Sequence, residues 1–163
     1  MVEIGNGEIE DGRKRDDLMY SALDVARYII WYCQEKSYAI NNLKLQKVLY
    51  FVQAQFLVFG KDNKPCFSEK IEAWQYGPVV SEVYREYKIF GSAHIPCGDM
   101  MDDFDIDESD KEMINGIVDR CNKYTAARLV DISHRQAPWK DAHESGKTVI
   151  DIAEIRNYFL RKS

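Results

Sequence analysis

The chain has 163 residues, of which 45% are hydrophobic and 30% charged, and its formal net charge is -5. This length and balance predict one soluble globular domain with a core large enough to fold unaided. The negative charge argues against phosphate-backbone binding as the main activity, since such binding depends on clustered lysine and arginine.

The N-terminus carries no apolar signal segment, and the longest apolar run, residues 48–59, is too short to span a bilayer. The four cysteines stand alone in the sequence, without the close pairs typical of zinc sites. We therefore expect a cytoplasmic protein with reduced thiols, no membrane partner and no cofactor.

Residues 1–17 mix both charges with glycine and contain few apolar side chains. Such a segment buries too little surface to repay the entropy of ordering. We expect a mobile tail over residues 1–17, followed by one folded domain over residues 18–163.

Two helices open the predicted domain. Ser21 followed by Asp24 predicts a capping box at the start of the first. The second begins at Asn41 or Asn42 and should end at Gly60 in a left-handed conformation. One buried seam should run along it, since apolar residues recur at helical spacing at Leu45, Leu49, Val52, Phe56 and Phe59. Other apolar residues lie outside that seam, so this helix belongs at the centre of the domain.

The less apolar part of the second helix carries polar and amphipathic side chains, at Lys44, Gln46, Lys47, Tyr50 and Gln53. A partly exposed polar face is the ordinary interpretation of such a stripe. A partner-binding stripe is the alternative.

After a turn at residues 61–65, the pattern from 67 to 76 approaches alternation, which predicts a short strand. Pro78 disfavours a helical conformation at Gly77 and suits the first turn of a helix. A third helix is therefore expected from residue 78 to about 90.

An irregular, strongly acidic connector follows over residues 92–108. The acidic run 99–110 is either a solvated loop or a mimic of nucleic acid for a basic partner. Further helices are predicted from a capping box at Ser109, from Thr125 until Pro138 ends that helix, and from Asp151. The sequence thus predicts a mainly α domain, α+β at most, with about six helices and one or two short strands near residues 67–76.

An aromatic corner lies where the predicted strand meets the Gly-Pro turn, at Glu72, Trp74, Tyr76, Gly77 and Pro78. Its rings either anchor the extended segment on the core or form a recognition surface, because Trp and Tyr are frequent in interface hot spots.

Catalytic and metal chemistry are weakly supported. His134 with Asp131 resembles a general base and its orienting carboxylate, but Ser133 lacks any nucleophile motif, so a structural histidine is favoured. His94 and Cys97 form a single pair, whereas structural zinc usually takes four protein ligands.

Several motifs together resemble the Panacea domain of SocA-like antitoxins, also described as phage-associated GepA-type proteins. These motifs are LKLQKVLYF at 43–51, Phe67, EAWQYGPVV at 72–80, VYREY at 83–87, LVDISH at 129–134 and APWK at 137–140. The resemblance extends over about residues 20–159.

The resemblance implies a non-enzymatic antitoxin that binds and suppresses a protein toxin from a neighbouring gene. The alternatives are a proteolytic adaptor with a protease as second partner, and a phage-associated interaction protein without a toxin; nucleic acid is not expected as a direct partner. The candidate partner-binding residues are Lys44, Lys47, Tyr50, Glu72, Trp74, Tyr76, Gly77, Pro78, His134 and Trp139.

Overall fold

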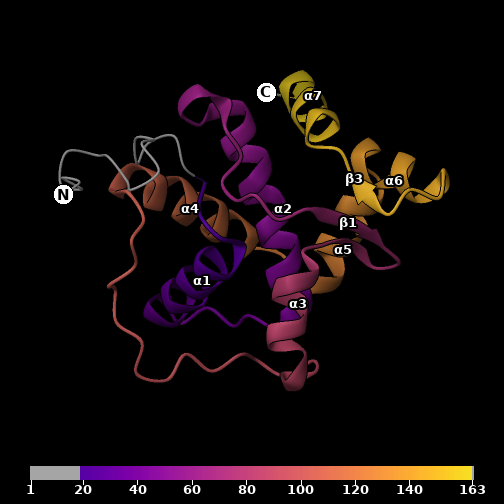
Figure 1. Cartoon of the computed structure of the whole chain (residues 1–163). Coiled ribbons are helices and arrows are strands. Elements are labelled where there is room, and N and C mark those ends of the chain that lie inside the picture. Colours follow the sequence, from indigo (N-terminus) through magenta and orange to yellow (C-terminus); the bar gives the residue numbers. More distant parts are fainter. Residues whose placement is uncertain (1–18, 163) are drawn as a thin grey trace, which may run out of the picture.

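Helix α2 (Asn42–Phe59) runs through the middle of the molecule, as its all-round apolar sequence predicts. The computed structural model describes residues 19–162, so the predicted tail over 1–17 lies outside the described residues. The helices packed against α2 are α1 (Ala22–Lys36), α3 (Ser81–Tyr87), α4 (Glu108–Cys121), α5 (Ala126–His134) and α7 (Ile152–Lys162). Figure 1 shows α2 crossing between them.

The first two helices begin where the sequence predicts. The Ser21 side chain accepts a hydrogen bond from the Asp24 amide, and the Asn41 side chain accepts one from the Lys44 amide. These bonds satisfy amides that the first turn of a helix leaves without an intrahelical partner.

The far end of α2 differs from the prediction in two ways. Gly60 is extended, with φ -75° and ψ 165°, so the expected left-handed cap is wrong. A Cβ on Gly60 would lie 2.6 Å from the Phe56 carbonyl oxygen, so glycine is needed there for space. Phe59 was expected in the buried seam, but 60% of its surface is exposed.

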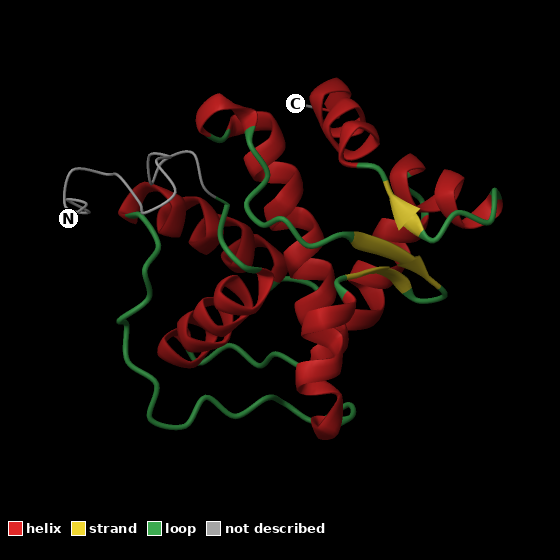
Figure 2. Cartoon of the chain, in the orientation of Figure 1, coloured by secondary structure: helices red, strands yellow, loops and turns green. Residues whose placement is uncertain are grey.

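A small antiparallel sheet lies beside α2, in the order β2-β1-β3 (Figure 2). Its strands are β1 (Ile71–Trp74), β2 (Gly77–Val79) and β3 (Val149–Ile150). Pro78 therefore lies in a strand, and the expectation that it opens the third helix is wrong, since α3 begins at Ser81. Proline is tolerated in β2 because β2 is an edge strand, where a missing N–H breaks no ladder bond.

Seven α-helices are present in the described residues, where about six were predicted. The additional helix is α6 (Ala137–Glu144): Pro138 lies in its first turn and opens it, as well as separating it from α5. The predicted capping box at Ser109 is wrong because α4 already begins at Glu108. Two short 3-10 helices cover Lys61–Asn63 and Lys88–Phe90.

Across residues 19–162, none of the helices has both the length and the apolar character that a membrane crossing requires.

Candidate functional site

Buried amide side chains from the first turns of α2 hold the β1–β2 hairpin and α3. The Val80 amide donates to Gln46 Oε1 at 2.9 Å, and Gln46 Nε2 donates to Asn42 Oδ1 at 2.9 Å. Asn42 Nδ2 in turn donates to the Tyr84 carbonyl at 3.1 Å. Because each buried amide has partners, this ladder fixes where the hairpin ends and α3 begins.

Lys47 continues the same face of α2 and is completely buried. Its Nζ donates to the Pro78 carbonyl oxygen at 3.0 Å, and burial lowers the pKa of the amine to about 7. Gly77 passes over it so closely that a Cβ there would lie 2.7 Å from Lys47 Cε and 2.9 Å from Ser133 Oγ. The Gly-Pro turn thus leaves no room for a larger residue above the lysine.

Two further polar residues of α2 bind distant segments. Tyr50 is buried and donates its hydroxyl to Gln136 Oε1 at 2.7 Å, between α5 and α6. Gln53 Oε1 accepts the amides of Cys66 and Phe67, and its Nε2 donates to the Phe67 carbonyl at 2.9 Å.

The predicted partly exposed polar face is therefore wrong for Gln46, Lys47, Tyr50 and Gln53, which are all buried. Their hydrogen-bonding groups face backbone and side-chain partners inside the fold, where they cost little because they are satisfied. Lys44 is only partly buried, and it lines a shallow depression with Asn122 and Lys123 at the end of α4, away from the hairpin.

The aromatic corner forms a groove on the outer side of the hairpin. This aromatic groove has a volume of about 470 Å³ and is lined by Asn41, Asn42, Leu43, Gln46, Trp74, Gln75, Tyr76, Val79, Tyr84, Lys88, Gly91 and Ser92. Tyr76 projects from the turn with 60% of its surface exposed. The groove therefore combines polar residues of α2 with aromatic walls, of which Tyr76 is exposed and Trp74 and Tyr84 are half-buried.

Trp74 is half-buried in this groove and belongs partly to the scaffold. Its ring meets Tyr84 edge to face, with centroids 4.9 Å apart. Its Nε1 donates to Glu72 Oε1 at 2.8 Å, while the Ser81 hydroxyl donates to the other Glu72 oxygen at 3.3 Å. Glu72 thus couples the strand to the start of α3.

A stack of rings supports the hairpin from the α6 side. His134 lies on Trp139 with ring centroids 4.0 Å apart, and Trp139 lies on His143 at 4.5 Å. Trp139 Nε1 donates to the Trp74 carbonyl at 2.7 Å. Burial lowers the pKa of His134, and the nearby Gln75 backbone opposes this shift in part.

The geometry does not assemble a nucleophile and base around His134. Asp131 forms ion pairs with Arg128 at 2.7 Å and with Arg135 at 3.0 Å, so its carboxylate is paired with arginines. Ser133 is fully buried and donates to the Val130 carbonyl.

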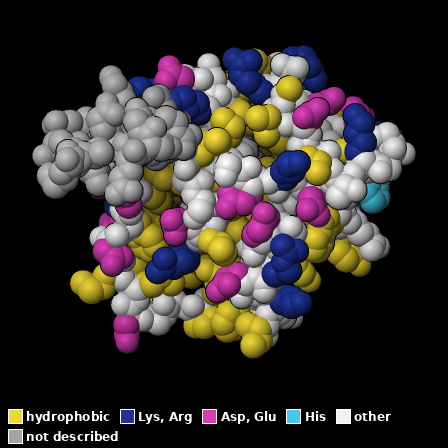
Figure 3. Space-filling view, viewed as in Figure 1, with side chains coloured by type: hydrophobic (Ala, Val, Ile, Leu, Met, Phe, Trp, Pro, Cys, Tyr) yellow, Lys and Arg dark blue, Asp and Glu magenta, His cyan; other side chains and the backbone are white. Residues whose placement is uncertain are grey.

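A second groove lies at the other end of α2, between α2, α4, α5 and α7. This basic-rimmed groove has a volume of about 620 Å³ and is lined by Phe51, Ala54, Gln55, Val58, Phe59, Ile117, Arg120, Cys121, Lys123, Tyr124, Leu129, Ile132, Phe159 and Lys162. On the face drawn in Figure 3, hydrophobic side chains reach the surface near the ends of α2 and α7, with lysine and arginine beside them.

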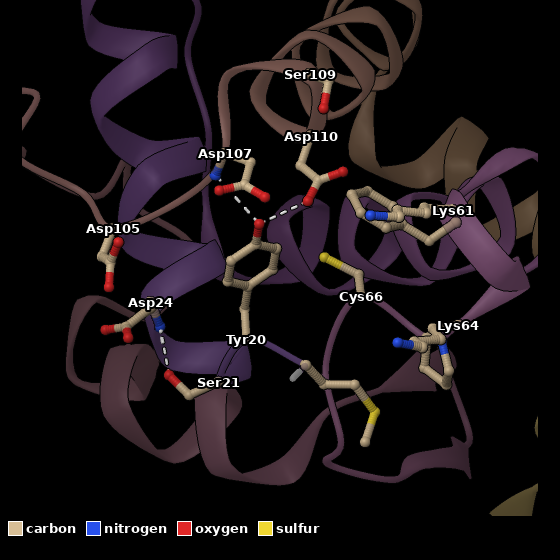
Figure 4. Close-up of a pocket in the computed structure, with 13 residues that line it drawn as sticks. Tyr20, Ser21, Asp24, Lys61, Lys64, Cys66, Asp105, Asp107, Ser109 and Asp110 are labelled. Carbon is tan, nitrogen blue, oxygen red and sulfur yellow. Dashed lines mark hydrogen bonds between the residues drawn. The ribbon is translucent and has the colours of Figure 1, made fainter. Parts of the chain in front are cut away.

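A polar pocket of about 350 Å³ lies beside the start of the described chain (Figure 4). Tyr20 lies inside it, donates its hydroxyl to Asp110, and accepts from the Asp107 amide at 3.1 Å. Burial is the main cause of a raised pKa at Tyr20, and the hydrogen bond to Asp110 is the second. These contacts attach the segment before α1 to the first turn of α4.

The structure brings nine of the ten predicted site residues to the hairpin or its supports, and leaves Lys44 apart. Tyr84 as a groove wall, and Arg120 and Lys123 as a rim, were not predicted from the sequence. Tyr84 could have been predicted from its spacing, because it lies four residues, or one helical turn, after Val80 at the end of the hairpin. Arg120 and Lys123 carried no such signal, because the groove that they border is formed by residues from four separate helices.

Comparison with known proteins gives two findings. The family model described as "Antitoxin SocA-like, Panacea domain" matches residues 45–140. Antitoxin SocA of Caulobacter vibrioides is 32% identical over 111 residues, which cover 61% of this chain and 58% of that protein. The chain thus matches less than two thirds of the length of this relative. No solved structure matches the chain.

Proposed function

Because its family model matches residues 45–140, the chain belongs to the SocA-like Panacea antitoxin family, and we propose that it neutralises a protein toxin encoded beside it. Neutralisation occurs by direct contact, and the chain itself makes or breaks no covalent bond. The name of the relative, Antitoxin SocA, supports a toxin as the partner.

The aromatic groove carries this proposal. Tyr76 and the half-buried Trp74 present ring surface at a turn whose backbone is held by Lys47 and by Trp139. Preorganised aromatic side chains bind at a low entropic cost, which is why such residues dominate interface hot spots. The groove is therefore suited to receive an apolar or aromatic side chain of the toxin.

The buried polar residues take an indirect part in this contact. Lys47, Gly77 and Pro78 are buried and hold the hairpin, so they do not touch the toxin. Tyr50 is buried as well and ties α2 to Gln136 between α5 and α6. His134 and Trp139 act in the same way from the α6 side.

Co-expression with the products of the adjacent genes tests the proposal. We expect one product to be toxic alone, to copurify with this chain and to be harmless when both are produced. Tyr76→Ala should weaken the complex by about tenfold or more while leaving the melting temperature unchanged, as for an exposed hot-spot residue.

Ile152→Ala is the matched control, because Ile152 is also exposed, at 45%, but lies outside both grooves. Trp74→Ala is a less informative variant, because Trp74 also stabilises the fold through Glu72 and Tyr84. Full protection and unchanged affinity in Tyr76→Ala would refute the aromatic groove as the contact. Absence of any toxic and copurifying neighbour would refute the antitoxin function itself.

A further inference from the structure

We propose that the basic-rimmed groove at the C-terminal end of α2 binds an acidic amphipathic segment of a protein partner. This inference goes beyond the toxin contact at the aromatic groove and does not depend on it. It follows from the apolar walls, the charge of the rim and the rigidity of the supporting helices.

The walls of the groove expose large apolar side chains to water. Phe59 is 60% exposed and Tyr124 is 43% exposed, and both lie beside the half-buried rings of Phe51 and Phe159. Contiguous apolar surface that is rimmed by polar groups is typical of sites for protein partners.

The rim of the groove has one sign of charge. Arg120, Lys123 and Lys162 line it, and no aspartate or glutamate is among the described residues that do so. Within residues 19–162, none of these three cations has a carboxylate at ion-pair distance. This concentration of positive charge stands out on a chain whose net charge is -5, and it favours a partner segment with acidic residues.

The supporting helices hold the groove open in a defined shape. Arg156 Nε donates to the Leu57 carbonyl at 3.1 Å, which ties α7 to the last turns of α2. Phe159 also meets Tyr50 and Phe51 edge to face, with centroid distances of 5.8 Å and 6.2 Å. A groove between rigid helices suits an amphipathic helix that inserts anchors at i, i+3 or i+4, and i+7.

The direct test is fluorescence anisotropy with the full chain and a labelled helical peptide of about four turns, because shorter helices are marginal in water. The peptide carries leucine at the anchor positions and glutamate on both flanks. A matched peptide carries lysine in place of every glutamate. We expect the glutamate peptide to bind, more tightly at low salt, and the lysine peptide to bind at least about tenfold more weakly.

Variants of the chain locate the binding. Arg120→Glu combined with Lys123→Glu should weaken the glutamate peptide by about tenfold or more and should restore some binding of the lysine peptide. Lys140→Glu is the control, since Lys140 is exposed on α6 outside both grooves, and it should leave binding unchanged.

Three results would overturn the proposal. The first is no binding of the glutamate peptide, and the second is equal binding of both peptides. The third is concentration-dependent self-association in sedimentation that Phe59→Asp abolishes, which would assign the groove to a second copy of the chain. The peptide measurement needs no toxin, so its failure leaves the antitoxin function standing, and failure of the co-expression test leaves the peptide result standing.

Discussion

Helix α2 differs along its length in the kind of side chain that it buries and exposes. From its first turns to just past its middle, the helix buries Gln46, Lys47 and Gln53, and each of them bonds to a segment outside the helix. At its C-terminus the helix leaves Phe59 in water beside a basic rim. The polar end therefore determines where other segments lie, whereas the apolar end leaves surface for a partner.

The difference follows from what each kind of group requires. A buried amide or amine is costly until its partner is in place, so it tolerates only one arrangement of the hairpin. An exposed phenylalanine requires nothing of the fold and gains only when another molecule covers it. Changes at the polar end should therefore reduce stability, and changes at the apolar end should reduce binding.

The largest loss of stability is expected from Gly77→Ala. Gly77 has φ +108°, which an L side chain rarely adopts, and a Cβ there would meet Lys47 Cε at 2.7 Å. We expect the free energy of unfolding to fall by about 3 kcal/mol, measured by urea denaturation. Gly116→Ala, in open space within α4, is the control and should raise it by about 0.5–1 kcal/mol. A loss below about 1 kcal/mol for Gly77→Ala would contradict both the strain at this φ and the contact with Lys47.

A somewhat smaller loss is expected from Gln53→Leu. Leucine has a side chain of similar volume but cannot form hydrogen bonds. The Cys66 and Phe67 amides and the Phe67 carbonyl therefore lose their side-chain partner. We expect a loss of about 2–3 kcal/mol, since buried groups left unsatisfied pay their full desolvation cost. Gln55→Leu, on a half-buried face two residues along, should change stability by less than about 0.5 kcal/mol. Equal effects for both glutamines would contradict the role given to the buried amide.

Lys47→Met should change how stability depends on pH. Burial lowers the pKa of Lys47 from 10.5 to about 7, so above pH 7 the folded chain has released a proton that the unfolded chain still holds. The free energy of unfolding of the wild type should therefore rise relative to the variant, by about 1–2 kcal/mol between pH 7 and 8.5. The pH range ends at about 8.5 so that the cysteine thiols contribute little. Burial raises the pKa of Cys33 and Cys121, so their ionisation in the unfolded chain lowers the free energy of unfolding as pH rises and opposes the effect of Lys47.

Denaturation series at several pH values measure this difference. Parallel stability curves for wild type and variant over that window would show that Lys47 stays charged in the folded state, with water or an anion as its partner.

Sequence periodicity was sufficient to place α2 at the centre. Residue type located the caps at Ser21 and Thr125 and limited the third to Asn41 or Asn42, of which Asn41 is the cap. It could not place Lys47 or Gln53, because their partners are backbone atoms on extended segments that carry no helical pattern. The general lesson is that a pattern of apolar residues identifies a buried face but not the polar groups that a fold can satisfy.

The candidate site was predictable to a similar extent. Trp74 and Tyr76 were identified by residue type at a Gly-Pro turn, yet only the hairpin register separates the half-buried ring from the exposed one. Phe59 follows Phe56 at helical spacing and was expected to be buried like it. Periodicity reports the direction of a side chain and not how far the neighbouring helices extend to cover it.

The smallest effect on stability is expected from Phe59→Ser, where the contrast between the two ends is sharpest. Because 60% of Phe59 is already exposed, the free energy of unfolding should change by less than about 0.5 kcal/mol. Ile89→Ser is the matched control, with 83% of Ile89 exposed outside both grooves. Both variants should denature like the wild type, but only Phe59→Ser should weaken binding of the glutamate peptide. A large loss of stability in Phe59→Ser would instead make this end of α2 part of the core, and the two ends would no longer differ in kind.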